Sequence, residues 1–250
     1  MNMSKIETLM VCGDSFQDTG VLGHEGTHWS EIVSSRLNLK LLNMASKGCS
    51  SVAVAFQLLH AENVPNCIVV GSMAAAEMRF EITSETLFGG KQTIDNFDYG
   101  PGKQHPLGNQ YPQRRHIRSV PMLNLNESDQ RFFLDKFSGS LKRETDLLTV
   151  LSALRRLRYR NIPVLFFQGL LGPGDGHQID MEDFKPYIEE HCIIPASEMS
   201  IFGNYIDVMK MDLDEIAKVD PGYHTSYERQ IEIADYMTEK IKDAIQLHTK

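Results

Sequence analysis

The sequence lacks any apolar run long enough to cross a lipid bilayer, which takes about 20 residues. Its N-terminus also lacks the charged-then-apolar pattern of a secretory signal peptide. An excess of positive charge is absent as well, since the formal net charge is −8. Non-specific nucleic-acid binding depends on a cationic surface. We therefore expect a protein that works without a membrane span and without nucleic acid as a partner.

Cysteine is scarce, and the four cysteines show neither C-x-x-C spacing nor the framework of a small disulfide scaffold. Cys12, Cys49 and Cys67 fall in or beside apolar stretches, as small buried residues do. Cys12 and Cys49 would approach each other if their strands were neighbours, but we expect no disulfide. This usage favours the cytoplasm or another reducing compartment.

The chain does contain a regular alternation of strand and helix patterns. Apolar runs predict strands at residues 8–12, 39–44, 67–71 and 163–168. Amphipathic spacing predicts helices at residues 29–37, 50–61, 129–158 and 227–247. The alternation predicts a parallel α/β sheet that is covered on both faces by helices. A chain of 250 residues with 42% hydrophobic side chains is long enough for one such domain, spanning residues 1–250.

One long stretch, residues 88–126, does not follow the alternation. It is rich in glycine, proline, histidine and arginine, and includes the segment Asp98-Tyr99-Gly100-Pro101-Gly102. Loops of this length are usually functional or disordered. We expect a loop insertion here, with three roles open: a lid, a substrate contact or a partner-binding loop.

The segment Gly13-Asp14-Ser15 carries the main chemical signal. It follows the first predicted strand directly, and glycine and aspartate at that place indicate a turn. Ser15 would then lie just past the carboxyl end of a strand, where open α/β sheets gather their ligands. A serine in such a position acts as a nucleophile when a histidine can take its proton. The segment Asp220-Pro221-Gly222-Tyr223-His224 could supply that histidine.

These segments resemble the SGNH (GDSL-type) hydrolases, a family of serine esterases and lipases with four short sequence blocks. Gly13-Asp14-Ser15 matches the first block, Asn43–Gly48 provides the glycine of the second, and Asp220 with His224 matches the fourth. The third block, Gly-x-Asn-Asp in the family, reads Gly71-Ser72-Met73-Ala74 here and lacks the asparagine. The resemblance implies a flavodoxin-like, three-layer α/β/α sandwich with a central parallel sheet. The start of the helix at Trp29 is also similar to helix starts in SGNH-like proteins of tailed phages.

The resemblance implies a role for each matching residue. Ser15 would be the nucleophile, His224 the general base and Asp220 the acid that orients the imidazole. The acid of the family stands three residues before the histidine, where this chain has Pro221, so Asp220 is one residue further away. The backbone amides of Ser15 and Gly48 would donate hydrogen bonds to the oxyanion. Neither a metal nor an organic cofactor is needed for this chemistry.

The missing asparagine would normally supply the third oxyanion donor. Loss of one such donor typically lowers the rate by about 100- to 1000-fold. Ser72 could replace it with a shorter hydroxyl, and Arg79, eight residues beyond Gly71, could supply positive charge or form a surface ion pair. Two functions therefore stay open. One is hydrolysis of a small-molecule ester or an acetylated carbohydrate, and the other is a binding or structural module that retains the fold without useful turnover.

A competing motif occurs at His24-Glu25-Gly26-Thr27-His28, which matches the H-E-x-x-H signature of zinc peptidases. That motif binds zinc only on a helix, where residues i and i+4 share one face. Gly26 interrupts the segment, and Thr27 is predicted to be the N-cap of a helix that begins near Trp29. The pattern therefore disfavours a metallopeptidase.

Overall fold

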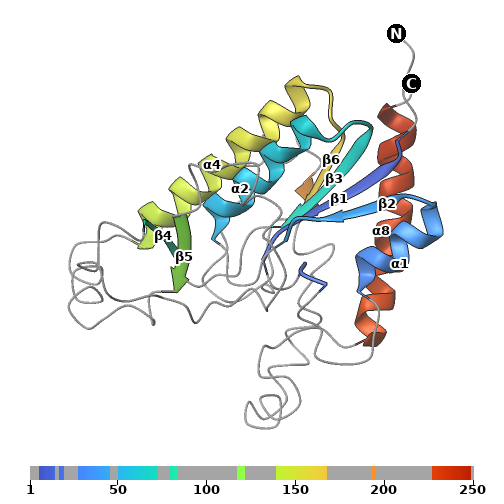
Figure 1. The fold of residues 1–250 in the computed structure, drawn as a ribbon, viewed down its shortest axis with the longest axis horizontal. Coiled ribbons are helices and arrows are strands. Elements are labelled where there is room, and N and C mark those ends of the chain that lie inside the picture. The colour runs from blue at the N-terminus through green and yellow to red at the C-terminus, as the bar shows by residue number, and fades with distance from the viewer. Residues whose placement is uncertain are drawn as a thin grey trace.

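The structure is a computed structural model, in which the described part of the chain comprises residues 6–14, 17–19, 28–45, 50–72, 79–83, 117–121, 139–167, 193–194 and 227–248 (Figure 1). Its centre is a five-stranded, all-parallel sheet with the strand order β2-β1-β3-β6-β7. The strands are β1 (Thr8–Cys12), β2 (Lys40–Asn43), β3 (Cys67–Ser72), β6 (Val164–Phe167) and β7 (Ile193–Ile194). The first four were predicted from the sequence to within about one residue at each end.

Helices cover both faces of this sheet, as the strand–helix alternation predicted. They are α1 (Trp29–Leu37), α2 (Ser51–His60) with the short 3-10 helix η1 (Ala61–Asn63), α4 (Gly139–Tyr159) and α8 (Tyr227–His248). Helices α2 and α4 pack against each other on one face, and α1 and α8 pack against each other on the opposite face (Figure 1). The arrangement is a three-layer α/β/α sandwich.

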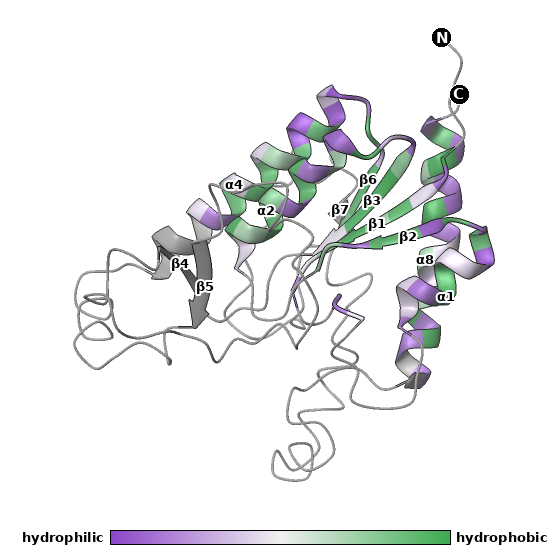
Figure 2. Cartoon of the chain, viewed as in Figure 1, coloured by the Kyte–Doolittle hydropathy of each residue, from purple (hydrophilic) through white to green (hydrophobic). Residues whose placement is uncertain are grey.

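The strands are apolar on both sides because both sides are covered. Alternate residues of β1 point to opposite faces, so that Met10 packs in the cluster with α2 and α4, whereas Leu9 and Val11 pack with α1 and α8. All of β1, β3 and β6 is buried, and these strands form the hydrophobic centre of the sheet in Figure 2. This is why their sequences read as continuous apolar runs rather than as alternating patterns.

Helix α1 begins at Trp29, as predicted, but its N-cap differs from the prediction. His28 rather than Thr27 is the N-cap: its Nδ1 accepts a hydrogen bond from the Ser30 N–H (3.2 Å). The Glu31 carboxylate accepts one from the His28 N–H (2.9 Å). A neutral imidazole nitrogen can serve as a cap acceptor just as a hydroxyl does, and the sequence pattern for caps does not include it. His28 thus lies outside the helix, so the H-E-x-x-H segment does not end on a helical face.

An antiparallel pair of strands, β4 (Arg79–Thr83) and β5 (Ile117–Pro121), forms a separate two-stranded sheet. Strand β5 lies inside the stretch 88–126 that interrupts the predicted alternation. Neither strand was predicted from the sequence. Unlike β1, β3 and β6, neither is an unbroken apolar run, because their sequences, RFEIT and IRSVP, include charged residues.

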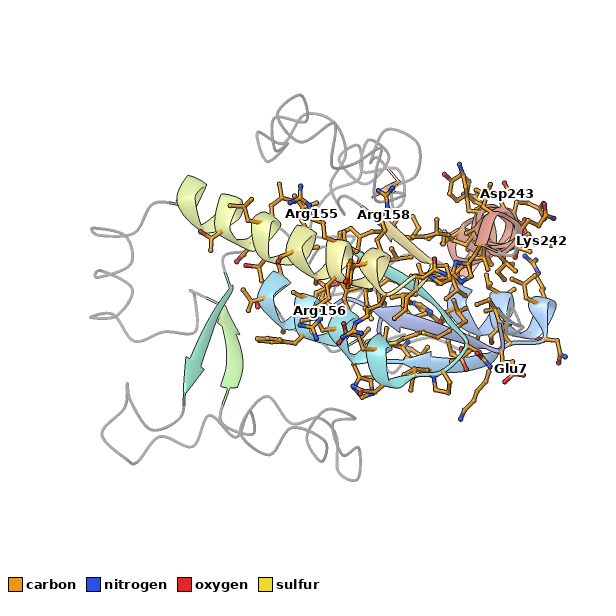
Figure 3. The ribbon with its side chains drawn as sticks, turned by 90° about the horizontal axis from the view of Figure 1, so that it is seen from above. Glu7, Arg155, Arg156, Arg158, Lys242 and Asp243 are labelled. Atoms are coloured by element: carbon orange, nitrogen blue, oxygen red, sulfur yellow. The ribbon has the colours of Figure 1, made fainter. Side chains whose placement is uncertain are left out.

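Three arginines near the end of α4, Arg155, Arg156 and Arg158, are exposed on the surface. Arg156 points towards η1, where its guanidinium forms a two-point ion pair with Glu62 (2.6 and 2.7 Å); Arg155 and Arg158 point elsewhere (Figure 3). The hydrogen bond from Arg156 holds the pKa of Glu62 below its ordinary value of 4.5, assisted by the charges of Arg156 and Arg160. The pair therefore stabilises the fold above about pH 4.5 and loses this contribution as the pH falls through the lowered pKa.

Glu62→Gln is expected to lower the urea midpoint only slightly at pH 7, because the pair is exposed to solvent and the attraction is screened. At pH 3 the difference between variant and wild type should shrink, since protonation of Glu62 weakens the same ion pair in the wild type. Urea unfolding at both pH values measures this. A difference that stays constant would show that the glutamate acts through packing rather than through its charge.

Candidate active site

Three neighbouring strands end together at one edge of the sheet. Strands β1, β2 and β3 end at Cys12, Asn43 and Ser72, and because they are parallel these ends lie side by side. The chain passes from β1 to β2 on one side and then to β3 on the other, so the connections change direction at β1. Ligand sites of open α/β sheets lie outside the carboxyl ends of the strands at such a reversal. This edge is therefore the candidate active site.

Gly13, the first residue after β1, has a backbone conformation that favours glycine, with φ of +155°. It is also closely surrounded. A Cβ atom at this position would lie 2.4 Å from Cγ of Gln17 and 2.8 Å from Oγ of Ser72. The turn into Asp14-Ser15 thus begins at a residue that only glycine fits, which explains the glycine of the predicted first block.

Gln57 of helix α2 binds this glycine at two points. The Gly13 N–H donates to Oε1 of Gln57 (2.7 Å), and Nε2 of Gln57 donates to the Gly13 carbonyl (3.2 Å). Gln57 is 1% exposed and stands in the otherwise largely apolar helix sequence SVAVAFQLLH. That lone amide among apolar residues is a signal that could have indicated its role, but our sequence analysis did not identify it.

The chain is also fixed on the other side of Ser15, at Gln17. The Gln17 carbonyl accepts a hydrogen bond from Nδ2 of Asn43 at the end of β2 (2.7 Å). The Gln17 side-chain oxygen accepts one from the indole Nε1 of Trp29 (3.0 Å), and the Gln17 N–H donates to the Asp14 carbonyl (3.1 Å). Residues on either side of Ser15 are therefore held by side chains from α1, α2 and β2.

A further buried amide connects the starts of the two helices on the α1–α8 face. The Trp29 N–H, one of the donors that a helix N-terminus leaves without a partner in its own helix, donates to Oε1 of Gln230 (2.8 Å). Gln230 lies in the first turn of α8 and six residues after His224 in the sequence. The hydrogen bond ties the beginning of α8 to the same Trp29 that binds Gln17.

Ser72, which the sequence suggested as a substitute for the missing asparagine, is the last residue of β3. It is 0% exposed, and its Oγ has no hydrogen-bond partner in the part of the chain that the structure describes. The same oxygen lies close to Gly13, since a Cβ atom on that glycine would be 2.8 Å from it. A buried hydroxyl without a partner costs about 1–3 kcal/mol. Such a cost is common at functional sites, where a ligand supplies the missing partner.

Five further site residues were predicted from the sequence. Ser15, Gly48, Asp220 and His224 lie outside the described residues. Arg79 is the first residue of β4, where its backbone is in register with Pro121 of β5.

Two buried ionisable groups have shifted pKa values: Cys67 at the start of β3 and His60 at the end of α2. Burial raises the pKa of the Cys67 thiol to about 11, and its Sγ donates to the Ala61 carbonyl (3.8 Å). Burial also lowers the pKa of His60, which follows Gln57 by three residues on α2. Cys67 is therefore a poor nucleophile, because the reactive form of a cysteine is its thiolate. Cys12 and Cys67 are both buried thiols rather than half-cystines.

Within the described residues, no helix combines the length and apolar character that a bilayer span requires. The same residues contain no group of three or more His, Cys, Asp or Glu side chains placed to hold a metal ion.

Comparison with known proteins gives a likeness at the level of the fold. No family model and no curated protein matches the sequence. The solved structure of TesA matches with 15% identity and a TM-score of 0.50, over 95% of this chain and 99% of TesA. The chain has the SGNH hydrolase fold. This confirms the predicted fold.

Two further solved structures of this fold match with lower TM-scores. A candidate lipolytic protein of the G-D-S-L family from Desulfitobacterium hafniense is 14% identical, with a TM-score of 0.45 over 93% of this chain and 98% of its own. A candidate SGNH hydrolase from Slackia heliotrinireducens is 10% identical, with a TM-score of 0.43 over 95% of this chain and 100% of its own.

Proposed function

We propose that this protein hydrolyses a carboxylic ester or an O-acetyl group through an acyl-enzyme formed on Ser15. The observation that carries the proposal is the close approach of Gly13 and Ser72 at the carboxyl ends of β1 and β3, where the strand order reverses. Asp14 and Ser15 follow Gly13 directly in the sequence. The SGNH hydrolase fold supports a nucleophile at this edge of the sheet.

The proposed reaction has two steps. In the first, the Ser15 hydroxyl attacks the acyl carbon while His224 takes its proton, and the imidazolium then protonates the departing alcohol. In the second, His224 takes a proton from water as the water oxygen attacks the acyl carbon. The ester bond to Ser15 then breaks, the acid is released, and the imidazolium returns the proton to the Ser15 oxygen. Asp220 orients the imidazole and stabilises its cation.

The oxyanion of each tetrahedral intermediate would be bound by the backbone amides of Ser15 and Gly48. Ser72 would supply the donor that the asparagine of the third block supplies elsewhere, and its buried, unpartnered Oγ supports that role. Binding of the oxyanion would then provide the hydrogen bond that the hydroxyl lacks among the described residues. Arg79 is proposed to contribute positive charge near the site.

The substrate we propose is a small-molecule ester or an acetylated carbohydrate, bound by a single domain of residues 1–250. The stretch 88–126 is proposed to contact it, since its polar and aromatic side chains suit a sugar. The reaction as written needs no metal and no organic cofactor.

Labelling with a fluorophosphonate, which reacts with activated serines, tests the proposal without knowledge of the substrate. Native protein should be labelled, Ser15→Ala should not be labelled at all, and His224→Ala should be labelled about 100- to 10,000-fold more slowly, as expected for loss of a general base. Ser35→Ala, which removes an exposed serine of α1, is the matched control and should be labelled normally.

Absence of labelling in wild-type protein whose circular dichroism shows it to be folded would overturn the proposal. It would favour the binding module, because the fold is common to both functions. If labelling persisted in Ser15→Ala, a different serine would be the nucleophile.

A further inference from the structure

The two hydrogen bonds between Gln57 and Gly13 resemble a short piece of strand pairing made by a side chain. The ladders of β1 with its neighbours end at Val11 and Cys12, so Gly13 is the first residue past the paired strand. Its N–H and C=O are bound by the two ends of one carboxamide, at 2.7 and 3.2 Å. A carboxamide carries both a donor and an acceptor, as a peptide group does, and therefore matches both groups of Gly13.

We call these two hydrogen bonds between Gln57 and Gly13 the brace. They bind a glycine, the residue type with the greatest backbone freedom. Glycine loses more conformational entropy on folding than any other residue, and Gly13 has a φ of +155° that other residues rarely adopt. Gln57 itself is 1% exposed, on a helix that packs against both the sheet and the neighbouring helix α4, so it has little freedom of its own. The Gln57 side chain, which is itself held by its surroundings, thus restricts the backbone conformation of Gly13.

We infer that Gln57 is a positioning residue, whose carboxamide fixes Gly13 and thereby the position of the Asp14-Ser15 segment that follows. The inference rests on the proposed role of Ser15 as nucleophile. A misplacement of reacting groups by about 1 Å can lower a rate by about 100-fold. Loss of the brace should therefore lower the rate at Ser15 by about 10- to 100-fold without preventing folding.

Gln57→Glu tests both hydrogen bonds in one protein, because the two protonation states of the introduced carboxyl group differ in one of them. When protonated, this carboxyl group would accept from the Gly13 N–H and donate to the Gly13 carbonyl, as the carboxamide does. When ionised, it would lack the donor and place its charge against the carbonyl oxygen. Burial and this repulsion raise the pKa of such a carboxyl group, so the protonated form is reached within the accessible pH range.

The measured quantity is the fluorophosphonate labelling rate of Gln57→Glu divided by that of the wild type. We expect a ratio within about threefold of one at pH 5 and a ratio of about 0.01 to 0.1 at pH 8. Asp14 beside Gly13, His60 on the next turn of α2 and His224 are present in both proteins, so any effect they have on the rate largely cancels in the ratio. A ratio that does not change with pH would overturn the inference.

Two further variants separate positioning from general loss of stability. Gln57→Met keeps a similar length and volume but makes neither hydrogen bond, so its labelling should be slow at every pH. Thr238→Val removes another buried hydrogen bond, from Thr238 Oγ1 to the Ala234 carbonyl (2.6 Å) in α8, and should be destabilised with normal labelling. Equal slowing in both variants at matched stability would mean that Gln57 acts only on the fold.

Hydrogen exchange of the peptide that contains residues 9–16 decides the inference independently of catalysis. Its amides should exchange at least about tenfold faster in Gln57→Met than in Thr238→Val under conditions of equal global stability. If the wild type is not labelled but this difference is found, the proposed hydrolase function fails and the brace stands. Equal exchange in the two variants would overturn the brace, whether or not Ser15 is labelled.

Discussion

Gly13→Ala is expected to lower the free energy of unfolding by about 2–5 kcal/mol and to abolish rapid labelling of Ser15. Two effects add: a positive φ strains a residue with a side chain, and a Cβ would overlap Cγ of Gln17 at 2.4 Å and Oγ of Ser72 at 2.8 Å. Relief of the overlap requires the turn to move away from both side chains. Such a movement also displaces the segment that leads to Ser15.

Urea unfolding followed by circular dichroism measures the stability, and fluorophosphonate labelling measures the site. Gly71→Ala is the matched control, because a Cβ there would meet Cδ2 of Phe166 and Cδ2 of Leu58 at 2.9 and 3.1 Å but Gly71 does not have the positive φ of Gly13. Overpacking alone typically costs about 1–3 kcal/mol, so the loss should be smaller than in Gly13→Ala. If Gly13→Ala is no less stable than Gly71→Ala, the turn is not confined as the structure indicates.

Trp29→Ala is expected to lower the free energy of unfolding by about 3–5 kcal/mol, the usual cost of removing a large buried aromatic side chain. Trp29 is 0% exposed and belongs to the core between the sheet and α8. Its indole also donates the hydrogen bond that holds Gln17, so the variant leaves a buried amide oxygen without this donor. Urea unfolding monitored by far-ultraviolet circular dichroism measures the loss. Tryptophan fluorescence cannot be used, because Trp29 is the sole tryptophan of the chain and the variant lacks it.

Trp29→Phe divides this loss between its two causes. Phenylalanine retains most of the apolar volume but has no N–H, so the expected loss of about 1–3 kcal/mol reports mainly the bond to Gln17. Labelling of Ser15 should slow in both variants, because Gln17 lies two residues further along the chain. Labelling at the wild-type rate in Trp29→Phe would show that this bond has no influence on the nucleophile.

The sheet and its helices could be predicted from the sequence because each element has a simple hydrophobic pattern. Strands β1, β3 and β6 are buried on both faces and read as unbroken apolar runs, while α8 shows a regular apolar stripe. The pair β4–β5 and the two-residue strand β7 could not be predicted, because their pairing joins short segments far apart in the chain. His28 as an N-cap was missed because caps are usually hydroxyls or carboxylates.

Two residues that the structure places together were predicted from the sequence, but the side chains that hold them were not. Gly13 was predicted from the turn after the first strand and Ser72 from the resemblance to the third block, and both lie at one edge of the sheet. The amides that fix them, Gln17, Gln57 and Gln230, come from segments whose approach depends on the tertiary fold. A polar residue in an apolar helix signals a buried hydrogen bond, but it does not tell which backbone group is its partner.

The packing of α8 has a consequence for how this protein is made. The face of β1 that carries Leu9 and Val11 is covered by α1 and by α8, and the bond from Trp29 to Gln230 joins residues 201 positions apart. During translation this face emerges early, whereas α8, which covers it, emerges after every other described element. We therefore expect a nascent chain with a long-lived apolar surface, slow final folding and a need for chaperones until α8 has left the ribosome.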